Sequence, residues 1–161
     1  MKLNLGSGFD YRKGWVNVEC APTRPADIRH DLDKFPYPFK KNTFDEVVMI
    51  NVLEHLREPI KCLKEVIRIS KDKAILKVVV PHAHSPSAFG DLQHRNFFTE
   101  HTFKEHILEE YGLSQLGEPE IRFVSMSKKN WWKRYIPFRR YLNLFFMGLY
   151  DEIEFKFTIK K

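Results

Sequence analysis

Cysteine, internal repeats and long apolar runs are scarce or missing in this chain of 161 residues. The two cysteines, Cys20 and Cys62, have no metal-binding spacing and form no disulfide framework, so we expect both to be reduced thiols. No run approaches the ~20 apolar residues that a membrane-spanning helix needs. The first residues show no charged and apolar leader of the kind that directs export. These absences predict a cytoplasmic protein.

Low-complexity linkers are also missing, and the composition is ordinary. Hydrophobic residues make up 43% of the chain, which is typical of a globular domain, and the length suits one hydrophobic core. We therefore expect a single domain over residues 1–161, present as a monomer or a homodimer.

The first eight residues join a short apolar run to a glycine-rich turn. The run Leu3-Asn4-Leu5 is typical of a buried strand, and Gly6-Ser7-Gly8 follows it directly. Because glycine has no Cβ, the chain can turn sharply there and present bare backbone N–H groups to a polar ligand. A single Gly-x-Gly motif is a weak signal for ligand binding, and a purely structural turn is the alternative.

Three further strand-like runs follow, and each leads into a polar residue. The predicted strands are Trp15–Val18, Asp27–His30 and Glu46–Ile50, and the polar residues after or at their ends are Glu19, Asp31 and Asn51. In an open α/β sheet the ligand crevice lies beyond the carboxyl ends of the strands. We therefore expect these polar residues to gather around one ligand.

Helical and strand-like patterns continue through the rest of the chain. The predicted elements are helices over Pro59–Ser70 and Thr99–Tyr111 and strands over Ala74–Val80, Glu120–Met126 and Glu152–Ile159. Thr99 is the expected N-cap of the second helix and Gly112 the residue that ends it. Strict alternation of apolar and polar residues in the last strand predicts one buried and one wet face.

A known family shares these features. The strand Phe44-Asp45-Glu46-Val47, which runs into Leu53-Glu54-His55-Leu56, together with Gly6-Ser7-Gly8, resembles the small class I S-adenosylmethionine-dependent methyltransferases. The resemblance implies a Rossmann-like α/β fold with a mostly parallel seven-stranded sheet, an antiparallel last strand and helices between the first five strands. Only five residues separate Gly8 from Gly14, so we expect the first crossover helix to be shortened or missing. Pro36-Tyr37-Pro38-Phe39 predicts an extended connection before the strand Glu46–Ile50, because proline disfavours helix for itself and for the residue before it.

The same resemblance implies S-adenosylmethionine as the cofactor and suggests how it is held. Glu19 would accept hydrogen bonds from two ribose hydroxyls, because one carboxylate can take both. Asp31 would bind the adenine amino group, with Asp33 as a nearby competitor, and Leu32 would offer its N–H to the ring. The expected cofactor-binding residues are Leu5, Gly6, Ser7, Gly8, Glu19, Asp31, Leu32, Asn51, Leu53 and His55.

Glu54 and His55 admit three interpretations: a general base, a metal site, or a hydrogen bond at the entry of a helix. A single Glu-His step does not place two ligands on one face of a helix, so we expect no metal there. The helix-entry hydrogen bond is favoured over catalysis for Glu54.

A long polar loop, residues 81–98, leaves the carboxyl end of the predicted strand Ala74–Val80 and should overhang the methyl group that is transferred. We predict His82, Asp91 and His94 as catalytic residues that hydrogen-bond the acceptor, with one histidine as proton acceptor. The composition of this loop also allows zinc or iron, but the spacing is irregular. We therefore expect transfer without added metal.

Acidic residues are absent from residues 121–150, which carry seven basic residues, while the remainder of the chain carries 20 basic and 21 acidic residues. An insertion over about 128–148 interleaves these cations with aromatic residues. An amphipathic helix on the sheet, a lid, a membrane-surface contact and base stacking on nucleic acid all suit that composition. The apolar run 143–149 favours a lid or a lipid-linked substrate over nucleic acid.

The pattern as a whole predicts methyl transfer to oxygen or nitrogen of a small-molecule, lipid-linked or sugar-linked acceptor, with peripheral membrane contact as an option. The alternatives are a methyltransferase acting on RNA or another nucleic acid and a non-catalytic S-adenosylmethionine-binding protein. A nicotinamide-dinucleotide protein is disfavoured, because Tyr11-Arg12-Lys13 offers no third glycine to open a helix.

Overall fold

The computed structural model describes residues 1–124, 135–138, 142 and 148–161. Most of the predicted insertion over 128–148 lies outside the described residues, as does Met126 at the end of a predicted strand.

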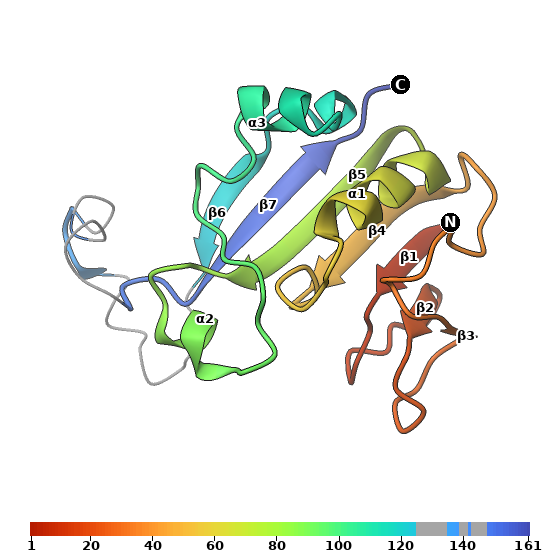
Figure 1. Ribbon diagram of the computed structural model, residues 1–161, viewed down its shortest axis with the longest axis horizontal. Coiled ribbons are helices and arrows are strands. Elements are labelled where there is room, and N and C mark those ends of the chain that lie inside the picture. The colour runs from red at the N-terminus through yellow and green to blue at the C-terminus, as the bar shows by residue number, and fades with distance from the viewer. Residues whose placement is uncertain (125–134, 139–141, 143–147) are drawn as a thin grey trace.

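A seven-stranded sheet organises the described chain (Figure 1). Its strands are β1 (Lys2–Leu5), β2 (Val16–Glu19), β3 (Ile28–Arg29), β4 (Phe44–Ile50), β5 (Ser70–Pro81), β6 (Glu120–Val124) and β7 (Glu152–Thr158). Their order across the sheet is β3-β2-β1-β4-β5-β7-β6. Neighbouring strands from β3 to β5 are parallel, whereas β7 is antiparallel to both β5 and β6. The predicted methyltransferase topology is confirmed.

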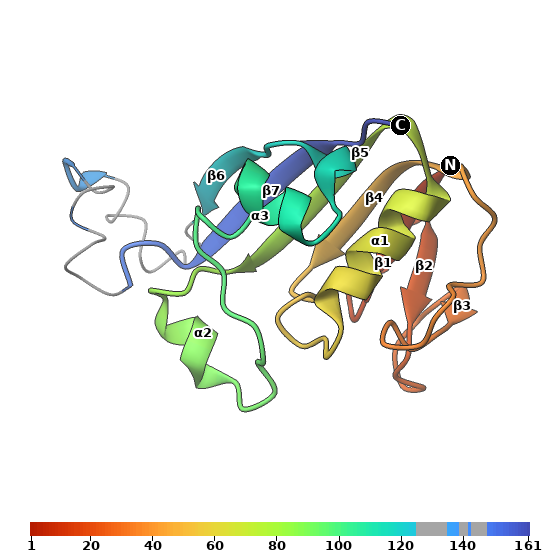
Figure 2. The same cartoon turned by 45° about the horizontal axis from the view of Figure 1, so that its top comes forward.

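The helices of the described chain gather in its middle part. They are α1 (Pro59–Ile69), α2 (Pro86–Gly90) and α3 (Glu105–Glu110), and a 3-10 turn, η1 (Ser114–Leu116), follows α3. Figures 1 and 2 show α1 and α3 lying over the same face of the sheet, while α2 lies beyond the carboxyl end of β5. None of the described helices is long and apolar enough to cross a membrane.

Turns, not helices, connect β1 to β2, β2 to β3 and β3 to β4. The missing first crossover helix and the extended connection before β4 were predicted, but the expectation of a helix between β2 and β3 was wrong. Pro25 lies in the second connection, and Pro36 and Pro38 lie in the third. Proline cannot donate a backbone hydrogen bond and disfavours helical conformation in the residue before it, so neither connection can hold an uninterrupted helix.

The second predicted helix has the right end but the wrong start. It begins at Glu105 rather than Thr99, because the Thr99 N–H is held in a turn by the hydroxyl of Thr102 at 2.9 Å. Its end is as predicted. Gly112 has a φ of 67°, and the next N–H, of Leu113, donates to the carbonyl of Leu108 at 2.6 Å. This geometry is a Schellman motif.

The two faces of the sheet differ in polarity. Alternate residues of β7 show it: Ile153, Phe155 and Phe157 are buried under the helices, as the strict alternation predicted. The other face carries cross-strand ion pairs. Lys77 pairs with Glu154 at 2.7 Å across β5 and β7. The described part of the protein therefore has two layers: the sheet, and the helices α1 and α3 that cover its apolar face.

Candidate active site

A cavity of about 340 Å³ opens at the carboxyl ends of β1, β2 and β4. From β1, the strand order runs outward to β2 and β3 on one side and to β4 and β5 on the other, so the cavity lies at the topological switch point. Seven predicted cofactor residues line it: Gly6, Gly8, Glu19, Asp31, Leu32, Asn51 and His55.

The other three predicted cofactor residues do not line this cavity. Leu5 lies in the hydrophobic core beneath the turn, with no exposed surface. Ser7 is buried, and its N–H donates to the carbonyl of Val18 at 3.0 Å. Leu53 is also buried in the core and lines a different cavity.

The two glycines of the first turn serve different purposes. Both have positive φ, 65° at Gly6 and 51° at Gly8. A Cβ on Gly6 would lie 2.6 Å from Cγ2 of Val52, whereas a Cβ on Gly8 would meet nothing within 4 Å. Gly6 therefore lets the turn after β1 pack against the turn after β4, and Gly8 leaves open space beside the cavity.

Glu19 is held in place by backbone N–H groups. Gly8 donates to its Oε2 at 2.8 Å, and Cys20 and Ala21 donate to its Oε1 at 2.8 and 2.9 Å. Burial alone would raise the pKa of Glu19, but the hydrogen bonds from Ala21, Gly8 and Cys20 outweigh it and lower the pKa. Glu19 is thus an ionised carboxylate at the cavity wall. Its Oε1 already accepts two backbone bonds and its Oε2 one, so one acceptor site on Oε2 is left for a hydroxyl donor.

The two aspartates after β3 have different partners. Asp33 accepts hydrogen bonds from the N–H groups of Arg57 and Glu58, at 3.0 and 3.1 Å, and so fixes the chain just before α1. Asp31 is exposed and accepts a bond from the Asp33 N–H at 3.0 Å. The competitor Asp33 is therefore committed to the backbone of another segment.

Asn51 ends β4 with a φ of 53°, a conformation that asparagine tolerates better than most residues. Its side chain donates to Oε1 of Glu152 on β7 at 3.1 Å, and its N–H donates to Val79 on β5 at 2.9 Å. These contacts bend the chain away from the sheet edge and into the turn that carries Glu54 and His55.

The polar loop after β5 is bound tightly to that turn. The N–H groups of Arg95 and Asn96 donate to the Glu54 carbonyl at 2.7 and 3.1 Å. The Asn96 side chain donates to the carbonyls of Leu53 and Leu56 at 2.9 and 2.7 Å. We call this set of four bonds the Asn96 strap. It brings His94 close to the 53–56 turn.

Glu54, His55 and His94 form a compact group beside the cavity. The ring centroids of the two histidines are 4.7 Å apart, and one candidate ligand atom from each of the three residues lies within 4.8 Å of the others. Glu54 is 1% exposed, and neither of its oxygens has a hydrogen-bond partner, nor does Nδ1 of His55. Sequence reasoning missed this group because its members come from two segments.

The pKa values in the group reflect burial. Burial raises the pKa of Glu54 to about 7, and the nearby carboxylates of Glu152 and Asp91 also raise it. Burial lowers the pKa of His55, and the neighbouring His94 lowers it further. Burial thus disfavours the charged form of both Glu54 and His55.

The three residues predicted to be catalytic are not together. Asp91 Oδ2 lies 4.0 Å from His94 Nε2, at the edge of the group. His82 is buried elsewhere: its Nδ1 accepts the His84 N–H at 3.1 Å, and its Nε2 lies 3.3 Å from Glu100. The structure thus joins His94 and Asp91 and gives His82 partners of its own.

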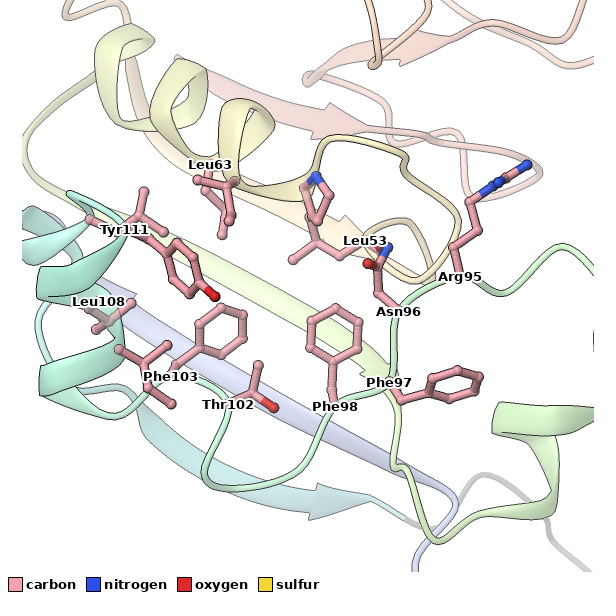
Figure 3. Close-up of a pocket in the computed structure, with 14 residues that line it drawn as sticks. Leu53, Leu63, Arg95, Asn96, Phe97, Phe98, Thr102, Phe103, Leu108 and Tyr111 are labelled. Atoms are coloured by element: carbon pink, nitrogen blue, oxygen red, sulfur yellow. Dashed lines mark hydrogen bonds between the residues drawn. The ribbon is translucent and has the colours of Figure 1, made fainter.

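A second cavity, of about 480 Å³, lies between α1 and α3 (Figure 3). Its lining is mostly apolar, and the rings of Phe98 and Phe103 point toward α1, while Phe97 points away. Leu53, Arg95 and Asn96 also line it, so it adjoins the segments that form the Asn96 strap.

Comparison with known proteins gives one family and several related folds. A methyltransferase-domain family matches residues 7–116, more than half of the chain. A curated protein of Methanocaldococcus jannaschii, named uncharacterized protein MJ0638, is 54% identical over 48 residues, 30% of this chain and 21% of that protein. The matched segment is therefore only about a fifth of that relative's length.

Two solved structures show the same fold at low sequence identity. A SAM-dependent methyltransferase from Archaeoglobus fulgidus has a TM-score of 0.69 and 14% identity, with coverage of 98% of this chain and 85% of that one. A chain from the Haloferax volcanii complex of the Trm112 methyltransferase activator with a methyltransferase has a TM-score of 0.66 and 14% identity, with coverage of 99% and 82%. By its family and its fold, this chain belongs to the class I S-adenosylmethionine-dependent methyltransferases.

Proposed function

We propose that this protein binds S-adenosylmethionine in the 340 Å³ cavity and transfers its methyl group to oxygen or nitrogen of a small-molecule, lipid-linked or sugar-linked acceptor. One observation carries the proposal. The turn of Gly6 and Gly8, the ionised Glu19 and the exposed Asp31 converge on one cavity at the switch point of a methyltransferase sheet.

Each cavity residue suits one part of that cofactor. Glu19 keeps its charge, and the acceptor site left on its Oε2 suits a ribose hydroxyl; the three backbone bonds leave no room for the second hydroxyl that the sequence suggested. Asp31 lines the cavity, and among the described residues its carboxylate accepts a hydrogen bond only from the nearby Asp33 N–H. It therefore has acceptor sites that suit an adenine amino group. The open space beside Gly8 leaves room for the methionine portion to approach the backbone.

The chemistry asks little of the protein beyond placement. When bound, S-adenosylmethionine supplies a methyl group already activated on a sulfonium sulfur. In the transfer, the acceptor atom bonds to the methyl carbon, the carbon–sulfur bond breaks with its electrons left on sulfur, and the acceptor proton leaves to a base or water. The residues around the cavity must hold the partners in line and exclude water. His94 lies beside His55, which lines the cavity, and Asp91 lies close to His94; this proximity supports their proposed contact with the acceptor.

The second cavity supports an acceptor with an apolar portion. It is walled by leucine and phenylalanine side chains, and Arg95 and Asn96 lie where it adjoins the loop of His94 (Figure 3). A lipid-linked or aromatic acceptor could place its apolar part there. The predicted contribution of residues 128–148 to acceptor or membrane binding stays a prediction, since most of that segment lies outside the described residues.

Calorimetric titration with S-adenosylmethionine and its demethylated product tests cofactor binding. Gly8→Leu should abolish binding, because a leucine there enters the cavity. Gly14→Leu is the matched control: Gly14 also has a positive φ, of 82°, and also faces open space, but does not line the cavity. Equal affinity in the two variants would contradict the assignment. Asp31→Ala should lose adenine selectivity with little change in stability, since Asp31 is exposed.

An acceptor screen with radiolabelled methyl donor tests the rest of the proposal. Pools of small hydroxyl and amine compounds, lipid-linked compounds and RNA are compared at low and high salt. Transfer to RNA that falls steeply with salt would identify a nucleic-acid methyltransferase instead. The Haloferax relative was solved with an activator protein, so the screen is also run with such an activator added.

A further inference from the structure

Two histidines beside the cofactor cavity each present one unprotonated nitrogen to the same small space. His94 Nδ1 lies 2.9 Å from the backbone carbonyl of Ala88. A carbonyl can only accept a hydrogen bond, so Nδ1 carries the proton and the lone pair is on Nε2. Nε2 is also the atom that lies 4.0 Å from Asp91.

His55 contributes a buried ring nitrogen of its own. Its Nδ1 has no hydrogen-bond partner among the described residues. In the tautomer that carries the proton on Nε2, Nδ1 offers a lone pair to a ligand.

Glu54 adds two more acceptor atoms to the same space. Glu54 is only 1% exposed, and neither of its carboxylate oxygens has a hydrogen-bond partner among the described residues. Buried carboxylates without partners are rare in folded proteins, because removing their hydration is costly. Asp91 and Glu152 add further negative charge nearby. Within the described residues, acceptors meet acceptors here, and a positively charged or hydrogen-bond-donating species is needed between them.

We propose that Glu54, His55 and His94 bind a divalent transition-metal ion beside the cofactor cavity. Two imidazoles and one carboxylate are a ligand set that zinc, iron and related ions accept, whereas magnesium prefers oxygen ligands. The Ala88 carbonyl behind His94 is the kind of outer partner that a metal-binding histidine normally has. The spacing of the candidate ligand atoms, all within 4.8 Å of one another, can close around one ion by side-chain adjustment.

A metal ion at this position would also take part in the proposed methyl transfer. This part of the inference rests on the proposed function. His55 lines the cofactor cavity as well as the metal group. An ion there lies on the acceptor side and can bind an acceptor hydroxyl and lower its pKa. The acceptor class then narrows to oxygen nucleophiles. Metal binding by the three residues does not itself depend on methyl transfer.

Calorimetric titration of chelator-treated protein with zinc, manganese and magnesium chlorides tests the site. We expect one equivalent of zinc and manganese to bind and magnesium to bind far more weakly. Glu54→Gln and His94→Ala should each weaken zinc binding by at least about 10- to 100-fold, the loss that even outer-partner changes cause. Glu110→Gln and His106→Ala, exposed residues of α3, are the matched controls and should bind as the unmodified protein does.

The competing explanation is a proton on Glu54, shared with His55. Glu54→Gln separates the two, because the glutamine amide can donate to His55 Nδ1 as a protonated carboxyl would. If the proton suffices, this variant keeps full transfer activity and the unmodified protein binds no metal at one equivalent, which overturns the proposal. Unchanged zinc affinity in both Glu54→Gln and His94→Ala also overturns it.

Titration of the same samples with S-adenosylmethionine keeps the two proposals apart. Metal binding without cofactor binding would remove the proposed function and leave the metal site. Cofactor binding without metal binding would do the reverse. Retained cofactor affinity in Glu54→Gln and His94→Ala also shows that these variants are folded.

Discussion

Glu19 and Glu54 both follow strands of the parallel sheet near the same cavity, yet the protein treats the two carboxylates in opposite ways. Glu19 accepts hydrogen bonds from three backbone N–H groups, and its pKa is lowered. Glu54 is more deeply buried, has no hydrogen-bond partner, and its pKa is raised to about 7. The charge of Glu19 is therefore stabilised by the protein alone. The carboxyl of Glu54 has no cation or hydrogen-bond donor against it among the described residues.

This difference separates the proposed cofactor side, where backbone hydrogen bonds stabilise the carboxylate charge, from the proposed acceptor side, where the carboxylate has no such bonds. Hydrogen bonds to a carboxylate stabilise its charge, whereas burial without them disfavours it. The two regions touch where Gly6, from the Glu19 side, packs on Val52, from the Glu54 side. Substitutions at these points test whether the contrast is a real property of the protein.

Gly6→Ala should have the largest effect, because it forces apart the two regions. The new Cβ would lie 2.6 Å from Val52 and would also occupy a positive φ. Overpacking and left-handed backbone together should cost about 2–5 kcal/mol of unfolding free energy. Gly14→Ala carries only the backbone cost, of about 1–2 kcal/mol. Urea denaturation of both variants measures the difference, and equal losses would show that the Val52 contact yields.

The pH dependence of stability should distinguish Glu54 next. Its pKa is raised from 4.5 to about 7, so the folded state holds this proton more tightly. The resulting stability is fully present below pH 4.5 and is lost as the pH rises through 7. At about 1.4 kcal/mol per pKa unit, metal-free protein should lose roughly 3 kcal/mol across that window.

Glu54→Gln should lack this loss, so the difference between the two proteins isolates the Glu54 contribution. Urea unfolding in the presence of chelator, at pH 5 and pH 8, measures it. Parallel pH profiles for the two proteins would mean that the carboxyl is not buried as described.

Asn96→Ala should weaken the acceptor side alone. The change removes two hydrogen bonds, to the carbonyls of Leu53 and Leu56, and leaves the Leu53 carbonyl with only the Leu56 N–H at 3.4 Å, at a cost of about 2 kcal/mol. Metal affinity should fall with stability, because His94 depends on the strap, while affinity for S-adenosylmethionine should hold. Gln93→Ala, an exposed side chain of the same loop, is the control. Loss of cofactor affinity in Asn96→Ala would show that the two sides are not independent.

Glu19→Gln should give the smallest change in stability and the opposite sign to Glu54→Gln above pH 7. The single amide nitrogen must face either the N–H of Gly8 or those of Cys20 and Ala21, so about 1 kcal/mol should be lost at this partly exposed site. Cofactor affinity should fall about tenfold, which corresponds to one lost hydrogen bond to a charged group. Calorimetry and thermal unfolding at pH 8 compare the two glutamines directly. Stabilisation by Glu19→Gln would reverse the contrast.

Local pattern was enough to predict the strands, and the family resemblance implied their topology. Apolar runs that end in glycine or a polar residue indicate buried strands with a ligand site at their carboxyl ends. This pattern predicted β1, β4 and a cavity at their ends. Pro36 and Pro38 predicted the extended connection before β4, but Pro25, which interrupts the connection between β2 and β3, was not used in the same way. The late start of α3 was missed because the turn at Thr99 depends on a local side-chain bond.

The sequence by itself determined the fold class, the family and the residues Glu19, Asp31 and Asn51 around one cavity, because these follow from strand ends that are local in the chain. Only the tertiary structure decided the fate of Glu54 and His94. Spacing argued against metal, since Glu54 and His55 are adjacent and His94 is distant. The Asn96 strap brings the three together, and burial then removes the water that would have satisfied the carboxylate. Contacts between distant segments and the loss of solvent are properties of the folded chain, and no local pattern encodes them.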